Sequence, residues 1–351
     1  MSSLGIVYGE IFATGHKPWR PHPEHPVRLR KALRAIARYG LKNVVEWFKP
    51  VKADIKDLEV VHAKGYIDYV VDLVSKAPAE IDPDTYVVKD SLETALYAFG
   101  SAIHYSLDSI EKKNNYLLLV RPPGHHTGIG GKACGAPTQG FCLFNNVAGA
   151  AKTILNNGYE GVVILDIDVH HGNGTQEIFY KQDKVLFISI HQDPKSLYPF
   201  NSGYIDEIGE GRGKGYNINI PLPPMAGDDC YNKALEFAIN LIKDYDPQII
   251  LVSAGFDGYK GDGMAELMIS SNTYYNIGIK LRELGKPVVS ILEGGYGPGL
   301  EYGLPAFVAG LLGMKNPVHD RETKSLPLTC NDVERVLSEL IKVVRNLWGT
   351  A

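Results

Sequence analysis

Short, almost wholly apolar runs rich in β-branched residues alternate with amphipathic stretches along most of this chain beyond its first hundred residues. Five runs stand out: Tyr116–Val120, Gly161–Ile167, Val185–Ile190, Gln248–Ser253 and Pro287–Leu292. Because a strand covered on both faces carries apolar residues at successive positions, these runs predict the strands of a parallel sheet. Their alternation with helical stretches is typical of strand-helix-strand units and predicts an α/β fold.

The amphipathic stretches around these runs have their apolar residues at helical spacing, so we predict that they form helices. They are Val27–Tyr39, Asn145–Leu155, Asp228–Lys243, Ser270–Leu284 and Asn331–Leu347, the last opening on a candidate N-cap asparagine. At 351 residues the chain is longer than most single cores, but the sequence contains no linker, low-complexity tract or internal repeat. We therefore predict one domain over residues 1–351, with long loops at one end of the sheet.

Charge and composition exclude several classes of function. The chain has 36 Lys+Arg against 40 Asp+Glu, a formal charge of -4, so we expect no direct nucleic-acid binding. No apolar run reaches the roughly 18 residues of a membrane helix, and the N-terminus lacks a secretory pattern, so we expect a cytoplasmic protein. The four cysteines include no CxxC pair, which favours incidental thiols over a disulfide framework or a zinc knuckle.

Ionisable residues follow the carboxyl ends of all five predicted strands. In chain order they are His125 and His126, then Asp166, Asp168 and His170, then His191, then Asp257, and finally Glu293 and Tyr296. The carboxyl ends of parallel strands form the edge at which open α/β sheets bind their ligands. The sequence therefore predicts an active site at this edge.

Two aspartates and a histidine alternate in the segment Asp166-Ile-Asp168-Val-His170. Alternate residues of a strand point to the same face, and Asp257 from another strand would complete a set of Asp168, His170 and Asp257. Three ligands with an open position are typical of a catalytic metal site. The alternative, that these residues cap helices and bridge loops, is poor because an unpaired buried carboxylate is strongly destabilising. Such ligands suit zinc, but ferrous iron, cobalt or manganese would also fit.

A protein base is useful beside such a metal, and the adjacent pair His125 and His126 supplies candidates. The preceding Pro-Pro-Gly turn fixes the backbone just before them, although the pair could instead cap a loop. Asp166 and Asn173 are placed to hold the second ring nitrogen of each histidine. Tyr296 follows two glycines and either donates its hydroxyl to an oxyanion or is a half-buried rim aromatic.

The glycine-rich segment Thr127–Gln139 lacks the spacing of a phosphate-binding loop. We interpret it as a rim loop of the active site, and its role beyond that is open.

Taken in order, these motifs resemble the zinc-dependent histone deacetylase superfamily, which includes acetylpolyamine amidohydrolases and acetoin-utilisation-type proteins. The segments that carry the resemblance are His22–Arg28, Val61–His62, Asp84–Tyr86, Arg121–His126, Gly140–Asn146, Asp166–Gly174, Ser189–His191, Ala254–Asp257 and Glu293–Tyr296. The resemblance implies a single arginase/deacetylase-like α/β domain with a mainly parallel sheet of about eight strands and the active site at their C-terminal ends. The His-His-Gly-Asn173-Gly form is similar to the class II and polyamine branches.

The resemblance also implies a role for each catalytic residue. Asp168, His170 and Asp257 would bind Zn²⁺, with Fe²⁺ or Co²⁺ possible. His126, oriented by Asn173, would be the general base and then the acid. His125, paired with Asp166, would be its electrostatic partner, and Tyr296 would polarise the acetyl carbonyl.

Further positions follow from the same resemblance. Phe141 and Tyr198, with Gly140, would wall the substrate tunnel, and Met264 lies where polyamine-selective members present an acidic gatekeeper. A structural K⁺ site would be formed by Asp166, Asp168, His170, Ser189 and Ile190.

The leading hypothesis is a metal-dependent hydrolase that removes acetyl from the ε-amino group of acetyl-lysine in proteins and releases acetate. Alternatives are a deacetylase of acetylated polyamines or other small amides, a binuclear manganese hydrolase such as arginase, and a non-catalytic acyl-lysine binding protein. The expected partners are acetylated lysine side chains or acetylated small amines as substrate. A homo-oligomer is possible.

Overall fold

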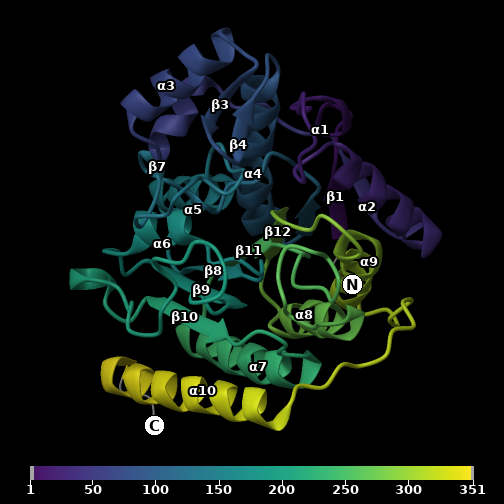
Figure 1. Ribbon diagram of the computed structural model, residues 1–351, viewed down its shortest axis with the longest axis vertical. Coiled ribbons are helices and arrows are strands. Elements are labelled where there is room, and N and C mark those ends of the chain that lie inside the picture. The colour runs from purple at the N-terminus through teal and green to yellow at the C-terminus, as the bar shows by residue number, and fades with distance from the viewer. Residues whose placement is uncertain (1–3, 349–351) are drawn as a thin grey trace.

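A parallel sheet of eight strands crosses the computed structural model, which describes residues 4–348 (Figure 1). The strands are β1 (Leu4–Val7), β2 (Glu46–Phe48), β5 (Asn115–Leu118), β8 (Val162–Asp166), β9 (Val185–Gln192), β10 (Asn217–Leu222), β11 (Ile249–Ala254) and β12 (Val288–Leu292). Their order is β10-β9-β8-β11-β12-β5-β1-β2, and every neighbouring pair is parallel. The prediction of one α/β domain with about eight parallel strands is confirmed.

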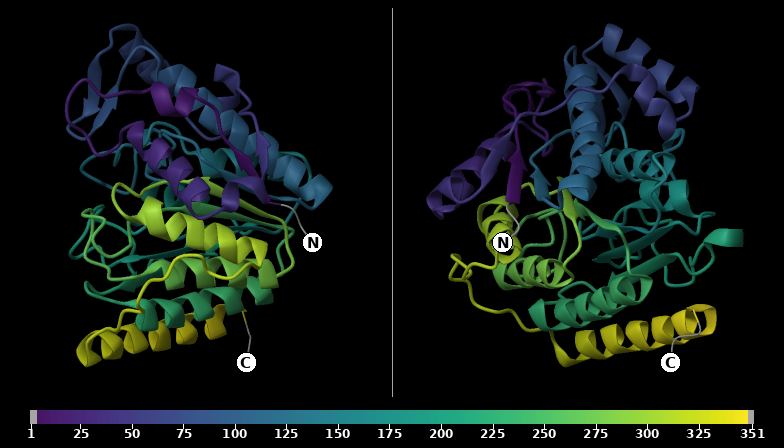
Figure 2. Two further views of the ribbon diagram at one scale, coloured as in Figure 1. Left: turned by 90° about the vertical axis from the view of Figure 1, so that its right-hand side faces the viewer. Right: turned by 180° about the vertical axis from the view of Figure 1, so that it is seen from behind.

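Helices cover both faces of this sheet. They are α1 (Ile11–Thr14), α2 (Val27–Arg38), α3 (Lys64–Ser75), α4 (Ser91–Lys112), α5 (Asn146–Asn156), α6 (Asn173–Phe179), α7 (Asp228–Tyr245), α8 (Ser271–Glu283), α9 (Leu304–Leu312) and α10 (Pro327–Trp348). On one face α4 packs against α5, and on the other α7 and α9 both pack against α8. Helix α10 lies outermost, against α7 (Figure 2). Among residues 4–348, no helix has both the length and the apolar character that a membrane span requires.

The five predicted strands are confirmed, and the central sheet contains three more that the sequence does not predict. Strands β8 and β11 are buried along their whole length, which is why their sequences are almost continuously apolar. Strand β2 has only three residues at the sheet edge, and β1 has four. Strand β10 interrupts its apolar run with Asn217 and Asn219, whose amides both donate to Gln176 Oε1 on α6. The sequence does not predict these strands because β1 and β2 are short and β10 contains polar residues.

Helix α10 differs from its predicted bounds, and the sequence does not predict α1, α3, α4, α6 or α9. Helix α10 begins at Pro327, four residues before the predicted cap, so Asn331 lies inside the helix. Proline suits the first position of a helix because its missing N–H would have no helical partner there. Helix α4, with 22 residues, was not predicted, because small residues such as Ala98, Gly100 and Ser101 occupy much of its buried face.

Candidate active site

A narrow cavity of about 130 Å³ opens where β5, β8, β11 and β12 end. Its lining residues are Asp84, Pro123, His125, His126, Gly140, Phe141, Asp168, His170, Tyr198, Met264, Gly294 and Tyr296. The cavity therefore brings together side chains that the sequence places more than two hundred residues apart.

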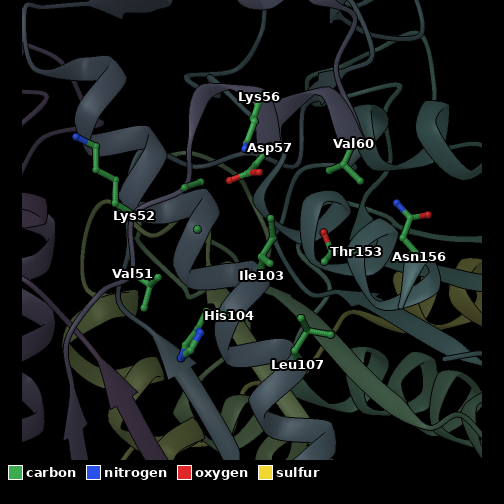
Figure 3. Close-up of a pocket in the computed structure, with 12 residues that line it drawn as sticks. Val51, Lys52, Lys56, Asp57, Val60, Ile103, His104, Leu107, Thr153 and Asn156 are labelled. Atoms are coloured by element: carbon green, nitrogen blue, oxygen red, sulfur yellow. The ribbon is translucent and has the colours of Figure 1, made fainter. Parts of the chain in front are cut away.

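A larger, open groove of about 500 Å³ lies elsewhere, between α4, α5 and the short helix η2 (Ile55–Val60) (Figure 3). Its polar lining includes Lys52, Asp57 and His104, and it contains none of the predicted catalytic residues. The groove is larger than the narrow cavity, but His125, His126 and Tyr296 line the narrow cavity.

Asp168, His170 and Asp257 form the metal-binding candidate, with one ligand atom of each within 4.8 Å of the others. Nδ1 of His170 lies 3.1 Å from Oδ1 of Asp168 and 3.3 Å from Oδ2 of Asp257. Burial and the charge of Asp168 raise the pKa of Asp257 to about 6. Oδ2 of Asp257 is buried and makes no hydrogen bond with any group of residues 4–348. A divalent cation would stabilise this arrangement of two buried carboxylates and a histidine, and it would bind the carboxylate oxygen that has no hydrogen bond.

Backbone amides hold the two carboxylates in place. The N–H of Gly294 donates to Asp168 Oδ2 at 2.8 Å, and the N–H of Val169 donates to Asp257 Oδ1 at 3.1 Å. A Cβ at Gly294 would approach Asp257 Oδ2 to 2.0 Å and Asp168 Oδ2 to 2.5 Å. Glycine at this position is therefore required for the loop after β12 to close over the carboxylates.

His126 is held by Asn173, the first residue of α6. Nδ1 of His126 and Oδ1 of Asn173 are 2.7 Å apart, and the Asn173 amide nitrogen donates to the Ala133 carbonyl at 2.9 Å. Because the amide nitrogen is committed to Ala133, this network assigns the ring proton of His126 to Nδ1 and leaves Nε2 as the base. Burial and the neighbouring histidines lower the pKa of His126 well below its ordinary value.

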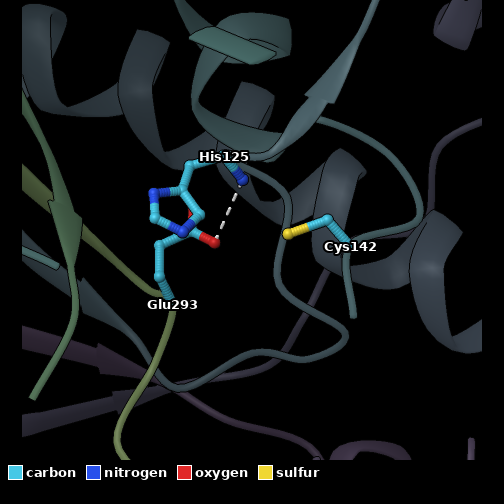
Figure 4. Close-up of side chains that lie close together, drawn as sticks. All are labelled: His125, Cys142 and Glu293. Atoms are coloured by element: carbon cyan, nitrogen blue, oxygen red, sulfur yellow. Dashed lines mark hydrogen bonds between the residues drawn. The ribbon is translucent and has the colours of Figure 1, made fainter. Parts of the chain in front are cut away.

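His125 is paired with Asp166, with Nδ1 and Oδ2 2.9 Å apart. Burial alone would lower the pKa of His125, but the charges of Asp166 and Asp168 outweigh it and raise the pKa to about 10. The carboxylate of Glu293 accepts from the backbone N–H groups of Gly124 at 2.7 Å and of His125 at 3.3 Å. Figure 4 shows Glu293 beside His125, with the Cys142 thiol nearby. Glu293 therefore anchors the turn that carries both histidines.

Tyr296 is positioned by residues to which sequence reasoning gives no role. The guanidinium of Arg28 lies 4.5 Å from the centre of the Tyr296 ring and donates to the Gly295 carbonyl at 2.7 Å. Asp262 accepts from the backbone N–H of Tyr296 at 2.9 Å. Burial raises the pKa of Tyr296 well above its ordinary value, so the hydroxyl keeps its proton and remains a donor. Arg28 lies in a motif that the resemblance quotes, and that was its only signal in the sequence.

Aromatic rings and the glycine-rich loop form the rim. The Phe141 ring meets Tyr296 edge-on at 5.6 Å, and the Tyr198 ring meets His126 edge-on at 4.8 Å. The Tyr198 hydroxyl donates to the Thr138 carbonyl, within the Thr127–Gln139 loop, at 2.8 Å. Gly140, at φ +53°, lies where a Cβ would approach the His126 ring to 2.4 Å. Met264 is half-buried at the same mouth.

The predicted potassium ligands lie on two neighbouring strands and in the segment that follows the first of them. Ser189 of β9 pairs in register with Asp166 of β8, and Ile190 follows it. The hydroxyl of Ser189 lies 2.8 Å from Nδ1 of His191. Asp168 and His170 continue the chain beyond β8 and belong to the metal-binding candidate themselves.

A further histidine, His62, contacts backbone groups of two segments that follow the histidine pair in the chain. Its Nδ1 lies 2.9 Å from the Gly128 carbonyl, and its Nε2 accepts from the Asn145 N–H at 3.0 Å. Asn145 in turn is the N-cap of α5 and donates to the Thr127 carbonyl. His62 must be neutral to make both contacts, and burial lowers its pKa to about 4 from the ordinary 6.5.

The lowered pKa of His62 predicts that the folded protein loses stability in mild acid. Between pH 6.5 and 4 the unfolded chain binds a proton at His62 and the folded protein does not, so the free energy of unfolding falls as the pH falls. The contribution approaches about 1.4 kcal/mol per pH unit in the middle of that window. The amide of His62→Gln can still donate and accept a hydrogen bond. This variant should reduce the slope of the free energy of unfolding against pH by up to about 1.4 kcal/mol per pH unit, measured by denaturant titration at several pH values. His104→Gln, at an exposed histidine, should leave it unchanged, and equal slopes for all three proteins would contradict the assignment.

Known proteins resemble this chain in sequence and in fold. Residues 22–311 match the model of the histone deacetylase domain. A probable deacetylase of Archaeoglobus fulgidus is 36% identical over 88% of this chain and 85% of its own length. Acetylpolyamine amidohydrolase 1 of Pseudomonas aeruginosa is 46% identical over 51% of this chain and 50% of its own length.

The fold comparison agrees. The crystal structure of the HDA15 HD domain superposes with a TM-score of 0.88 at 30% identity, covering 99% of this chain and 97% of that one. The match spans the sheet, both helical layers and the loops that build the cavity. This chain therefore belongs to the histone deacetylase family and is a hydrolytic deacetylase.

Proposed function

We propose that this protein hydrolyses the acetyl amide on the ε-amino group of acetyl-lysine in proteins and releases acetate and the free amine. The observation that carries the proposal is the convergence of Asp168, His170, Asp257, His126 and Tyr296 on one narrow cavity with aromatic walls. A cavity of about 130 Å³ suits a slim, linear side chain better than a branched or cyclic one.

A zinc ion held by Asp168, His170 and Asp257 would polarise the substrate carbonyl and increase the acidity of the attacking water. His126 accepts the proton of that water at Nε2, because Nδ1 is committed to Asn173. The same nitrogen then returns the proton to the departing amine. The Tyr296 hydroxyl donates to the oxygen on which negative charge develops, and His125 lies beside His126, with ring centroids 4.0 Å apart.

The walls of the cavity favour an alkyl stem. Phe141 and Tyr198 present ring surfaces at the mouth, and each buried methylene of a lysine stem contributes about 0.8 kcal/mol. The four methylenes of lysine would therefore supply binding energy that a free acetamide lacks.

Two cation assignments belong to the same proposal. Zinc is the proposed catalytic ion, with Fe²⁺ or Co²⁺ as alternatives that the same oxygen and nitrogen ligands accept. A structural K⁺ ion would lie beside Asp166, Asp168, His170, Ser189 and Ile190. The support for K⁺ is the register of Ser189 with Asp166, because both are buried polar residues at paired positions of neighbouring strands.

Deacetylation of acetylated polyamines is the second candidate. Asp84 lines the cavity and could attract the distal ammonium of such a substrate, and the Pseudomonas relative is named for this chemistry. Met264 opposes it, because an apolar side chain stands at the mouth where a cationic substrate would enter.

A side-by-side assay separates the two candidates. The zinc-loaded protein should have a higher kcat/KM for an acetyl-lysine peptide than for an N-acetylated diamine. Met264→Glu should shift that preference toward the diamine, because it adds a carboxylate at the mouth, whereas Met314→Glu, at an exposed methionine, should not. A strong diamine preference in the wild type would move the function to small-amide hydrolysis. Turnover of neither substrate by metal-loaded protein would contradict the proposal.

A further inference from the structure

Two cysteines that are far apart in the sequence meet away from the active site. Cys230 lies in the first turn of α7 and Cys330 in the first turn of α10. Their Sγ atoms are 2.8 Å apart. Cys230 is fully buried and Cys330 is half-buried, so Cys330 is the more exposed residue of the two.

The backbone around the two thiols is already held in place by other contacts. The Ser325 hydroxyl donates to Asp229 Oδ1 at 2.7 Å, and Lys233 on α7 pairs with Glu334 on α10. At the far end of α10, Nε1 of Trp348 donates to the Gly215 carbonyl at 3.1 Å. Helix α10 is therefore fixed against the protein at both ends, and joining the two sulfurs requires little movement of the chain.

We propose that Cys230 and Cys330 form a disulfide bond that fastens α10 to α7. A low-molecular-weight disulfide is the oxidant. The Cys330 thiolate attacks it, which breaks its S–S bond, forms a mixed disulfide and releases one small thiol. The Cys230 thiolate then attacks the sulfur of Cys330 and releases the second small thiol. Two protein thiols and one small disulfide become one protein disulfide and two small thiols.

A shared metal ion is the competing interpretation of the same cluster. Oδ2 of Asp229 lies 3.8 Å from the Cys330 sulfur, so two thiols and a carboxylate are close together. Two thiolates on one tetrahedral zinc, each at about 2.3 Å from it, lie about 3.8 Å apart. The observed separation is much shorter, and the Asp229 carboxylate already accepts from Ser325 and from the Cys230 N–H. These contacts favour the covalent bond.

The bond would act on stability and leave the active site unchanged. It closes a loop between residues 230 and 330, which removes conformational freedom from the unfolded chain. Neither cysteine lines the catalytic cavity. The other two cysteines are separate: the Cys134 sulfur donates to the Asn173 carbonyl at 3.4 Å, and Cys142 lies beside His125 and Glu293.

Thiol counting on the full-length protein tests the proposal. After incubation with oxidised glutathione, the denatured wild type should expose two alkylatable thiols instead of four, and a digest should contain a Cys230–Cys330 linked peptide that reductant separates. The oxidised protein should melt about 5 to 10 °C above the reduced protein. Cys330→Ser should abolish that difference, and Cys134→Ser, at a cysteine outside the pair, should retain it.

Three outcomes would overturn the proposal. The first is four alkylatable thiols after oxidation, and the second is a cross-link that involves Cys134 or Cys142. The third is stoichiometric zinc that protects Cys230 and Cys330 from alkylation and is lost in Cys330→Ser, which would establish the metal site instead. The thiol count and the melting comparison both use the wild-type chain, so a poorly folded variant would not obscure the result.

Discussion

Replacing His126 with alanine is expected to lower kcat on an acetyl-lysine peptide by about 10²- to 10⁴-fold, the usual contribution of a positioned general base. The variant keeps the metal-binding residues and the Tyr296 hydroxyl, but nothing at the position of Nε2 accepts the proton of the attacking water. The loss should appear in kcat more than in KM, because the imidazole acts on the reaction and contributes little to holding the substrate.

Two further variants make this result specific. His126→Gln has a side chain closer in volume and no base, so it should lose about as much turnover and show that a vacated space is not the cause. His104→Ala removes an exposed histidine in the groove between α4 and α5 and should keep wild-type rates. Wild-type kcat in His126→Ala would show that another group takes the proton.

Replacing Tyr296 with phenylalanine is the second large effect, with an expected loss of about 10²- to 10³-fold in kcat. The substitution removes one hydroxyl and keeps the ring against Arg28 and Phe141, so the loop after β12 should keep its place. The developing oxyanion then lacks its protein donor. Circular dichroism and melting temperature should match those of the wild type.

Tyr302→Phe provides the matched control, because it removes a tyrosine hydroxyl from the neighbouring helix η4 (Gly299–Gly303), outside the catalytic cavity. It should keep wild-type kcat. If Tyr296→Phe also kept wild-type kcat, the hydroxyl would have no part in stabilising the oxyanion, and the role would fall to the metal alone.

The sequence predicts the centre of the sheet better than its edges, for a physical reason. Strands β8, β9, β11, β12 and β5 are covered on both faces, and burial on both faces leaves a continuous apolar run that is visible without any tertiary information. The short strands β1 and β2 have no such run, and the asparagines of β10 are stabilised by Gln176, a contact that the sequence does not reveal.

The same contrast holds in the candidate active site. Asp168, His170, Asp257 and the histidine pair were predictable because each follows a recognisable strand, and parallel strands end at one edge. The residues that position these side chains were not predictable, since their roles depend on contacts between segments that are distant in the sequence. Arg28 reaches Gly295 across 267 positions, and Glu293 holds the N–H of Gly124 across 169. Arg28 is one of several basic residues in α2, so the sequence gives no sign that this arginine makes such a contact.

Metal dependence is the claim on which the proposed chemistry rests most heavily. The most direct measurement is deacetylation of an acetyl-lysine peptide by the wild-type protein, first stripped with a chelator and then reloaded with one equivalent of zinc, with the bound metal measured by mass spectrometry. Stripped protein should lose nearly all turnover and zinc should restore it. Asp257→Asn, which keeps the shape of the side chain but loses its charge, should not be restored, whereas Asp68→Asn, on the exposed face of α3, should behave like the wild type. Full turnover by protein shown to contain no metal would contradict the assignment of Asp168, His170 and Asp257.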